Sequence, residues 1–354
     1  MSWLSLTAFG PPGFNPSPSD SDRLTQTELQ VVRGSAPPTI MARAAVLVDA
    51  DTGRVLWSYN GRRRMPMAST TKMMTALLTV RYADPEEIVT IYPRDLVGGS
   101  RVGLRAGESV TVEQLLYGAL VPSGNDAAVA LADYIGRKYL GGVGDEGISA
   151  FVDAMNAQAR RMGLRDTRFR NPNGFDAPGH YSTAVDLAKL GRAVMADPLL
   201  SDIVSTVRYK VVGYVASGQR RTELRHPVET TNELLGSYRG ANGVKTGTTP
   251  RAGEVLVASA KRGNAKMIGV VLNSTNRFGD VRALFDWGFA TYEWLPLSSR
   301  IFGPLVPPAA DKLTFAAVER WNTDLTFATQ SASGPVYWAS TERLRAEPVP
   351  DLEP

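Results

Sequence analysis

The stretch MASTTKMM at residues 67–74 decides how the rest of the chain is interpreted. Ser69 and Lys72 stand three positions apart at the start of an apolar run that leaves almost no polar face. This pattern predicts a buried helix, with Pro66 just before its start. Residues i and i+3 share a helix face, so the lysine amine would lie within reach of the serine hydroxyl. Taken alone, the pair favours a capping serine and a lysine whose charged end reaches solvent, and only the sequence further along the chain reverses that preference.

Composition favours two domains, or one large domain with appendages, because 354 residues with 43% hydrophobic content can bury a substantial core. The 39 basic and 35 acidic residues are well mixed, which argues against a nucleic-acid partner. Cysteine is absent and histidine occurs only twice, at His180 and His226. Disulfides and cysteine catalysis are therefore excluded, and a Ser-His-Asp hydrolase or a multi-histidine metal site is poorly supplied. No cofactor or metal is expected.

The chain divides into three predicted segments. Residues 1–37 are rich in proline and serine and predict a flexible N-terminal arm; no secretory signal is recognisable in the first six residues. Residues 38–295 form the main domain. Residues 296–354 form a small β-rich appendage, with three short strands expected at 313–315, 325–327 and 336–338. No apolar run is long enough to span a bilayer, so membrane association is not evident.

Alternating and helical periodicities predict the elements of the main domain. Thr111 and Asp126 are expected to cap two of its helices, and Gly163 to end a third. The expected strands are 44–50, 54–59, 87–92, 254–260 and 266–272, with a polar, strand-like stretch at 210–229; the expected helices begin at 69, 111 and 126 or span 149–162, 183–195 and 280–292; a glycine-rich loop at 98–107 and a turn at 240–243 complete the pattern.

Three short motifs follow one another along the chain: STTK at 69–72, SGN at 123–125 and KTG at 245–247. Each motif alone is weak, but the ordered set is similar to that of penicillin-binding proteins and β-lactamases. With DADTG, SGNDAA, NPNG, HYSTA and KTGTT, the chain resembles the D-alanyl-D-alanine carboxypeptidases among the low-molecular-mass penicillin-binding proteins over most of residues 39–295. The resemblance implies an α+β fold like that of β-lactamases and transpeptidases: an antiparallel sheet flanked by helices, an all-helical lobe and a small C-terminal β appendage.

The resemblance also implies a division of labour in the site. Ser69 is the nucleophile, and Lys72 can activate it only as a neutral amine. Lys245 helps because a second cation disfavours the charged form of Lys72. Ser123 relays a proton to the leaving amine, while Asn125 holds the substrate amide or the Lys72 side chain.

Two further requirements fall on the third motif. By resemblance, the backbone N–H groups of Ser69 and Thr248 stabilise the oxyanion, and Gly247 lets the substrate approach. Lys245, Thr246 and Thr248 would bind the terminal carboxylate. Arg277 occupies a place similar to that of an arginine that assists carboxylate binding in this family, although a solvated loop arginine fits its surroundings equally well.

These implications predict a serine peptidase that removes the terminal D-alanine from peptidoglycan stem peptides and is inhibited by β-lactam antibiotics, with an extracytoplasmic location inferred from the substrate. A serine β-lactamase is the nearest alternative, but it needs a group that activates water, and NPNGF at 171–175 offers no glutamate. A penicillin-recognising sensor or wall-binding protein is the other alternative. Hydrolysis and transpeptidation stay open. His180 is interpreted as structural rather than as a general base.

Overall fold

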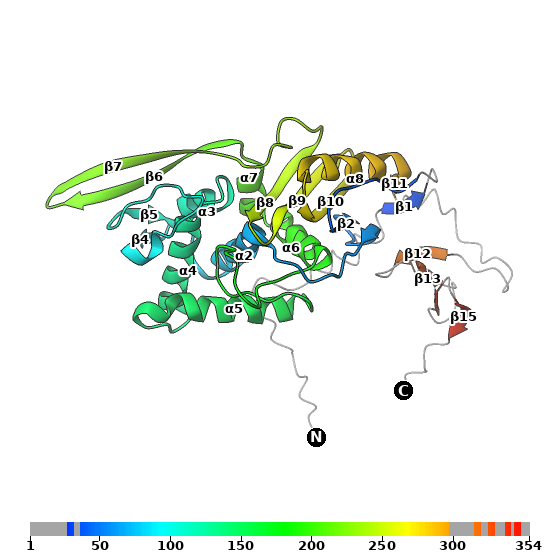
Figure 1. Ribbon diagram of the computed structural model, residues 1–354, viewed down its shortest axis with the longest axis horizontal. Helices are drawn as coiled ribbons and strands as arrows, with labels where there is room; N and C mark the ends of the chain where they lie inside the picture. The colour runs from blue at the N-terminus through cyan, green and yellow to red at the C-terminus, as the bar shows by residue number, and fades with distance from the viewer. Residues whose placement is uncertain are drawn as a thin grey trace, which may run out of the picture.

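A five-stranded antiparallel sheet forms the centre of the protein (Figure 1). The structure is a computed structural model, and it describes residues 27–31, residues 36–296 and four short strands beyond residue 314. Its strands, in spatial order, are β3 (Val55–Tyr59), β2 (Ala44–Asp49), β10 (Ala265–Ser274), β9 (Gly253–Arg262) and β8 (Ala241–Thr249). The order leaves β8, which carries the third motif, at one edge of the sheet. An edge strand has unpaired backbone groups, so β8 can pair with an extended ligand.

Both faces of this sheet are covered, which explains why its central strands are continuously apolar. Alternate residues of a strand point to opposite faces. Val46 and Val48 belong to the hydrophobic cluster on the face that packs against α6 (Ala184–Ala196), while Leu47 belongs to the cluster that includes Phe285 of α8 (Arg277–Thr291). The sheet is therefore a middle layer between helices, and its edge rather than its face is available for function.

A lobe of helices packs beside the sheet and supplies the first two motifs. It contains η1 (Ala68–Thr71), α2 (Lys72–Tyr82), α3 (Val112–Leu120), α4 (Asn125–Tyr139), η3 (Gly144–Glu146) and α5 (Gly147–Arg161). Thr111 caps α3 by accepting a hydrogen bond from the Gln114 backbone N–H, as the sequence predicts. The antiparallel sheet and the helical lobe confirm the predicted α+β fold.

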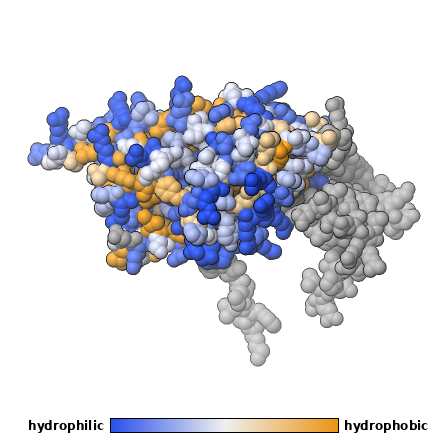
Figure 2. All heavy atoms as spheres, viewed as in Figure 1, coloured by the Kyte–Doolittle hydropathy of each residue, from blue (hydrophilic) through white to orange (hydrophobic). Residues whose placement is uncertain are grey.

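A second antiparallel sheet carries a long hairpin. Its strands are β4 (Ile88–Thr90), β5 (Ser109–Thr111), β6 (Arg208–Ser217) and β7 (Arg220–Glu229), with η2 (Pro93–Asp95) after β4 and α7 (Pro198–Ser205) before β6. Figure 1 shows the β6–β7 hairpin projecting well away from the body of the protein. On the face seen in Figure 2, hydrophobic residues gather toward the side that carries this hairpin, and hydrophilic residues dominate its middle.

The peripheral strands refine the predicted segments. Within the stretch expected to be a flexible arm, β1 (Thr27–Val31) pairs with β11 (Tyr292–Pro296). The C-terminal segment holds four antiparallel strands rather than three: β12 (Phe315–Glu319), β13 (Leu325–Thr329), β14 (Tyr337–Ser340) and β15 (Arg343–Glu347). The six residues tested for a signal lie outside the described part, and the domain boundaries stay predictions. Within the described ranges, no helix has the length and apolar character needed to cross a membrane.

Three local predictions were wrong. Ser69 lies in a 3-10 turn, and the α-helix begins only at Lys72. Asp126 does not cap α4, whose N-cap is Gly124. Residues 241–243, expected in a turn, already belong to β8, because they pair with the end of β9. In each case a tertiary contact outweighs the local pattern.

Phe285 provides a test of the packing between α8 and the sheet. Its side chain has no exposed surface, whereas Phe289, one turn later, is only partly buried. Phe285→Ala should lower the free energy of unfolding by about 3–5 kcal/mol, because it removes a large buried side chain and leaves a cavity. Phe289→Ala should cost clearly less. Urea unfolding of both variants measures the difference, and equal losses would contradict this description of the core.

Candidate active site

Ser69 and Lys72 lie in direct contact at the junction of η1 and α2. The Lys72 Nζ atom donates a hydrogen bond to Ser69 Oγ over 2.9 Å. The chain reaches this arrangement through Ala68, whose φ of +48° is a left-handed value that residues with a side chain rarely adopt. The turn places the serine hydroxyl over the amine at the start of the helix, so the geometry of the predicted nucleophile and base is present.

Lys72 is fully buried, yet its amine is well supplied with acceptors. Besides Ser69, it donates to Asn125 Oδ1 and to the backbone oxygen of Asn173, both over 2.7 Å. Burial, followed by the positive charge of Lys245, lowers the pKa of Lys72 well below its ordinary value, while Asp126 opposes the shift. A lowered pKa raises the fraction of neutral amine, and only the neutral amine can accept the serine proton.

Asn125 connects Lys72 to the glycine-rich loop. Its Nδ2 donates to the Gly98 oxygen over 2.8 Å, and its backbone N–H donates to the Ser100 oxygen over 2.7 Å. The next residue, Asp126, accepts hydrogen bonds from the backbone N–H groups of residues 102, 103 and 104. The second motif therefore holds this loop against the site, which is why Asp126 is unavailable as a helix cap.

Ser123, the other side chain of the second motif, lies at the break between α3 and α4. It is buried, and its φ of +66° is again left-handed. Backbone strain of this kind persists only where the surrounding structure enforces it. The bond from the Gly124 N–H to the Gly118 oxygen, 2.9 Å long, closes the break. Ser123 therefore lies in the break itself, and Asn125, the partner of Lys72, begins the helix that follows it.

The third motif runs along β8 beside Ser69. A Cβ atom on Gly247 would lie 2.9 Å from the Ser69 backbone nitrogen, so only glycine allows this approach. Lys245 is 1% exposed and donates to the Thr246 oxygen over 3.1 Å. Burial, helped by the Arg277 guanidinium, lowers the pKa of Lys245 to about 7. The side chain of Thr246 is buried and hydrogen-bonded to Thr231.

Arg277 reaches back from the start of α8 to the same strand. Its Nη1 donates to Thr248 Oγ1 over 2.8 Å and to the Gly247 oxygen over 3.2 Å. Its Nε is buried and has no hydrogen-bond partner among the described residues. The structure thus brings Arg277 to the motif, where a solvated loop arginine would not be.

His180 holds the turn that precedes the nucleophile. Its Nδ1 accepts a hydrogen bond from the Arg170 backbone N–H over 3.0 Å, so in the neutral ring the proton is on Nε2. Nε2 lies 2.8 Å from Thr71 Oγ1, which itself donates to the Ala68 oxygen over 2.8 Å. Burial lowers the pKa of His180 to about 4. A neutral imidazole in this chain of bonds supports the structural interpretation.

Sequence reasoning assigned no role to two residues of the NPNG segment. The backbone oxygen of Asn173 accepts from Lys72, and Gly174 passes so close to the turn that a Cβ atom there would lie 2.1 Å from the Ala68 oxygen. The Pro172 oxygen accepts from Thr75 over 2.6 Å, which docks the segment on α2. The motif itself was visible, but a role carried by a backbone oxygen leaves no trace in residue type. Within the described ranges, no group of three or more residues of metal-ligating type gathers.

A serine and a buried lysine that share a hydrogen bond, between a sheet edge and a helical lobe, define the class of serine acyl-transfer sites in which lysine is the base. A family profile described as D-alanyl-D-alanine carboxypeptidase, peptidase family S11, matches residues 31–276. The chain belongs to this family.

Individual relatives agree with the assignment. The D-alanyl-D-alanine carboxypeptidase DacF of Bacillus subtilis is 35% identical over 268 residues, covering 73% of this chain and 65% of its own length. The solved Streptomyces K15 DD-transpeptidase is 35% identical, with a TM-score of 0.67 over 72% of this chain and all of its own. A D-alanyl-D-alanine carboxypeptidase from Mycobacterium tuberculosis is 32% identical, with a TM-score of 0.63 over 74% of this chain and 96% of its own. The chain therefore spans about two thirds of the first of these relatives.

His180 gives a stability test of its neutral state. In the unfolded chain it takes up a proton near its ordinary pKa of about 6.5, but in the folded protein only near 4. Stability is therefore lost as the pH falls through this window. Between pH 7 and 5, His180→Gln should lose about 1–2 kcal/mol less unfolding free energy than the wild type, at ~1.4 kcal/mol per pKa unit. Urea unfolding at both pH values measures this, and equal losses would contradict a buried neutral imidazole.

Lys245 provides a second stability test, at neutral to alkaline pH. Above its unfolded pKa of about 10.5 the amine is neutral in both states and costs nothing. As the pH falls toward 7, the unfolded chain gains a proton that the folded site resists, so the native state loses stability. The wild type should therefore gain a few kcal/mol between pH 7 and 10 relative to Lys245→Met. Parallel stability curves for the two proteins would show that the ammonium is not desolvated.

Proposed function

We propose that this protein is a serine D-alanyl-D-alanine carboxypeptidase that removes the terminal D-alanine of peptidoglycan stem peptides through an acyl-enzyme on Ser69. The observation that carries the proposal is the bond of 2.9 Å from the buried Lys72 amine to Ser69 Oγ. Family membership supplies the reaction class, and the contacts of Lys72 with Ser69 and Asn125 support the acylation step.

Acylation begins when Ser69 Oγ attacks the carbonyl carbon of the penultimate D-alanine. Its proton passes to the neutral Lys72 amine, and the carbonyl oxygen becomes an oxyanion. The backbone N–H groups of Ser69 and Thr248 are the proposed donors to that oxyanion. General-base assistance of this kind is worth about 10²–10⁴-fold in rate, so Lys72 carries much of the acylation step.

Collapse of the tetrahedral intermediate breaks the C–N bond. The leaving nitrogen takes a proton that originates on Lys72 and is relayed by the Ser123 hydroxyl, and D-alanine departs. Asn125 keeps Lys72 in place through its amide oxygen. Water then attacks the ester carbonyl and gives a proton to Lys72. As the bond from the acyl carbon to Ser69 Oγ breaks, Lys72 returns that proton to Ser69 Oγ, and the shortened peptide leaves with a new carboxylate. Attack by an amine instead of water would complete a transpeptidation, and both routes use the same acyl-enzyme.

Lys245 and Arg277 supply the cations that a free terminal carboxylate requires, with Thr246 and Thr248 as additional donors. Binding of the carboxylate favours the charged form of Lys245, whose pKa of about 7 leaves it only partly protonated at neutral pH in the empty site. The substrate thereby strengthens the charge that keeps Lys72 neutral. β-Lactam antibiotics present a strained carbonyl beside a carboxylate and are proposed to acylate Ser69 as inhibitors. Peptidoglycan, the proposed substrate, lies outside the cytoplasmic membrane, and we propose the same location for the protein.

The test compares the purified full chain on N-acyl peptides ending in D-Ala-D-Ala and on penicillin. The peptides should release D-alanine catalytically, because their acyl-enzyme is accessible to water once D-alanine has left. Penicillin should label the protein and inhibit it, because the 171–175 segment contains no carboxylate to activate water. Ser69→Ala should abolish labelling by a fluorescent penicillin while the fold, followed by circular dichroism, stays unchanged.

Each other result has a definite meaning. Rapid multiple turnover of penicillin would favour a β-lactamase. Failure with both compounds would favour a sensor or wall-binding protein. Labelling that survives in Ser69→Ala would remove Ser69 from the mechanism, and unchanged acylation by Lys72→Ala would remove lysine as its base.

A further inference from the structure

The three motif positions of β8 give a bound peptide its direction. Lys245 and Thr246 begin the proposed carboxylate site, which Arg277 and Thr248 complete, and Gly247 lies against Ser69. Further along the strand, Thr249 Oγ1 donates to Asp176 Oδ1 over 2.8 Å. A peptide whose carboxylate lies at the Lys245 end and whose scissile carbonyl faces Ser69 therefore has its upstream residues beside Thr249. Two strand residues span about 7 Å, which is also the span of two residues of an extended substrate.

A pocket of about 210 Å³ lies next to this end of β8, since its lining includes Arg251 and Asp176, the partner of Thr249. Three segments line it, and each leads directly into the catalytic centre: residues 64–66 precede η1, residues 176–181 follow the NPNG segment, and Arg251 follows β8. The volume is well above the roughly 30 Å³ share of one water molecule and below the roughly 300 Å³ at which sites for whole small ligands begin. It is the size of a single side chain.

The charges in this pocket are predominantly positive. Its one acidic lining residue, Asp176, already accepts bonds from Thr249 and, over 3.1 Å, from the Arg251 backbone N–H. The exposed guanidinium of Arg251 makes no ion pair with any described residue. Gly179, also in the wall, lies beside the Arg170 guanidinium: a Cβ atom there would be 3.2 Å from its Nε. Two arginines face one carboxylate in this lining, and both oxygens of that carboxylate already accept a hydrogen bond, so an anionic group meets more opposite charge here than a cationic one.

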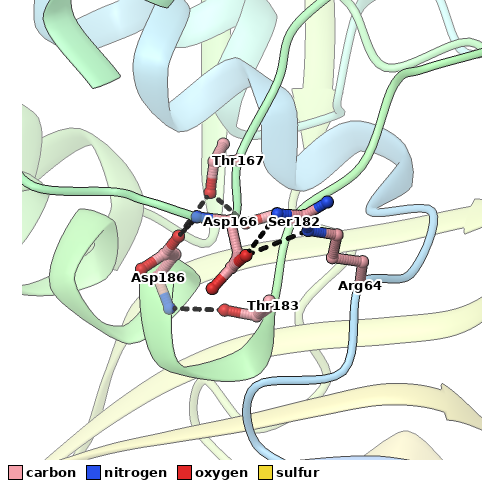
Figure 3. A network of polar contacts seen from close by, with 6 residues as sticks. All are labelled: Arg64, Asp166, Thr167, Ser182, Thr183 and Asp186. Carbon is pink, nitrogen blue, oxygen red and sulfur yellow. Dashed lines mark hydrogen bonds and ion pairs between the residues drawn. The ribbon is translucent and has the colours of Figure 1, made fainter. Parts of the chain in front are cut away.

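Arg64, the second cation of the wall, is held in a fixed position. Figure 3 shows it reaching to Asp166, whose Oδ1 accepts from Arg64 Nε over 2.9 Å and from Nη2 over 2.7 Å. Asp166 is itself anchored, because its backbone N–H donates to Asp186 over 2.9 Å. The guanidinium also lies over the Tyr181 ring, 5.1 Å from its centroid. Asp166 compensates the charge of Arg64, whereas no carboxylate forms an ion pair with Arg251 among the described residues.

We propose that this pocket, lined by Arg64, Tyr181 and Arg251, is a specificity subsite for the residue that precedes the penultimate D-alanine. It selects a side chain that ends in a carboxylate. The inference rests on the proposed function, since the direction of the peptide follows from it. Arg251 supplies the main charge, and Arg64 and Tyr181 fix the wall against which the side chain lies.

The experiment uses matched peptides of the form N-acetyl-X-D-Ala-D-Ala, in which X is 2-aminoadipate, its side-chain amide, or lysine. The full chain should release D-alanine from the carboxylate peptide with a kcat/KM about tenfold above that for the amide, as expected for one charge-assisted contact. Lysine at X should be the poorest. Added salt should reduce the preference, because the pocket is open to solvent. Equal kcat/KM values for carboxylate and amide would overturn the proposal.

Variants test whether Arg251 is the source of the preference for a carboxylate side chain. Arg251→Gln should bring the carboxylate-to-amide ratio close to one, and Arg251→Lys should restore part of it. Arg160→Gln removes the same charge from an exposed position of α5 and should leave the ratio as in the wild type. A full preference in Arg251→Gln would contradict the assignment.

A binding measurement separates this proposal from the proposed function. The dissociation constants of the carboxylate and amide peptides for the Ser69→Ala protein, measured by calorimetry, need no turnover and should show the same preference. Loss of penicillin labelling and of D-alanine release in the wild type, with the binding preference intact, would reject the reaction and keep the subsite. Turnover without any preference in rate or binding would reject the subsite alone.

Discussion

Removal of the Lys72 amine from water is the constraint on which the rest of the structure depends. A buried amine is tolerated only where acceptors replace its water. Here the acceptors come from three places that are distant in sequence: the turn before the helix, the start of α4 and the NPNG segment. The contacts that solvate the amine are therefore also the contacts that assemble the cleft. Desolvation and hydrogen bonding act together, since desolvation raises the fraction of neutral amine and the hydrogen bonds orient it.

This convergence leaves little space around the nucleophile, and the backbone shows it. Gly174 of the NPNG segment and Gly247 of β8 both contact the turn that contains Ser69. Neither position has room for a Cβ atom. Ala68 and Ser123 adopt left-handed conformations without being glycine. Strain in the turn before Ser69 and at Ser123 is offset by packing elsewhere, because the surrounding helices and sheet are extensively buried. The elements around Ser69 are therefore closely packed.

The sequence predicts much of this fold because its signals are local. The apolar runs of β9 and β10 and the cap at Thr111 follow from residue pattern alone. The order of the motifs predicts that Ser69, Lys72 and Asn125 meet, and they do. Other features could not be predicted, since they depend on partners without a residue signature. Asp126 binds backbone N–H groups of a loop 22 to 24 residues earlier, and β1 pairs with a strand near the far end of the main domain.

The crowding of cations around the third motif has a consequence for the empty protein. Lys245 is almost closed to solvent beside Arg277, and a buried donor of that arginine is unpaired within the described structure. Like charges that are removed from water repel each other, so Lys245 and Arg277 destabilise the folded chain when no anion is bound between them. Any small carboxylate that enters, reactive or inert, relieves this repulsion and shifts the unfolding equilibrium by mass action. Resistance to heat and to proteases should therefore track the concentration of cleft-binding anions, whether or not those anions are ever turned over.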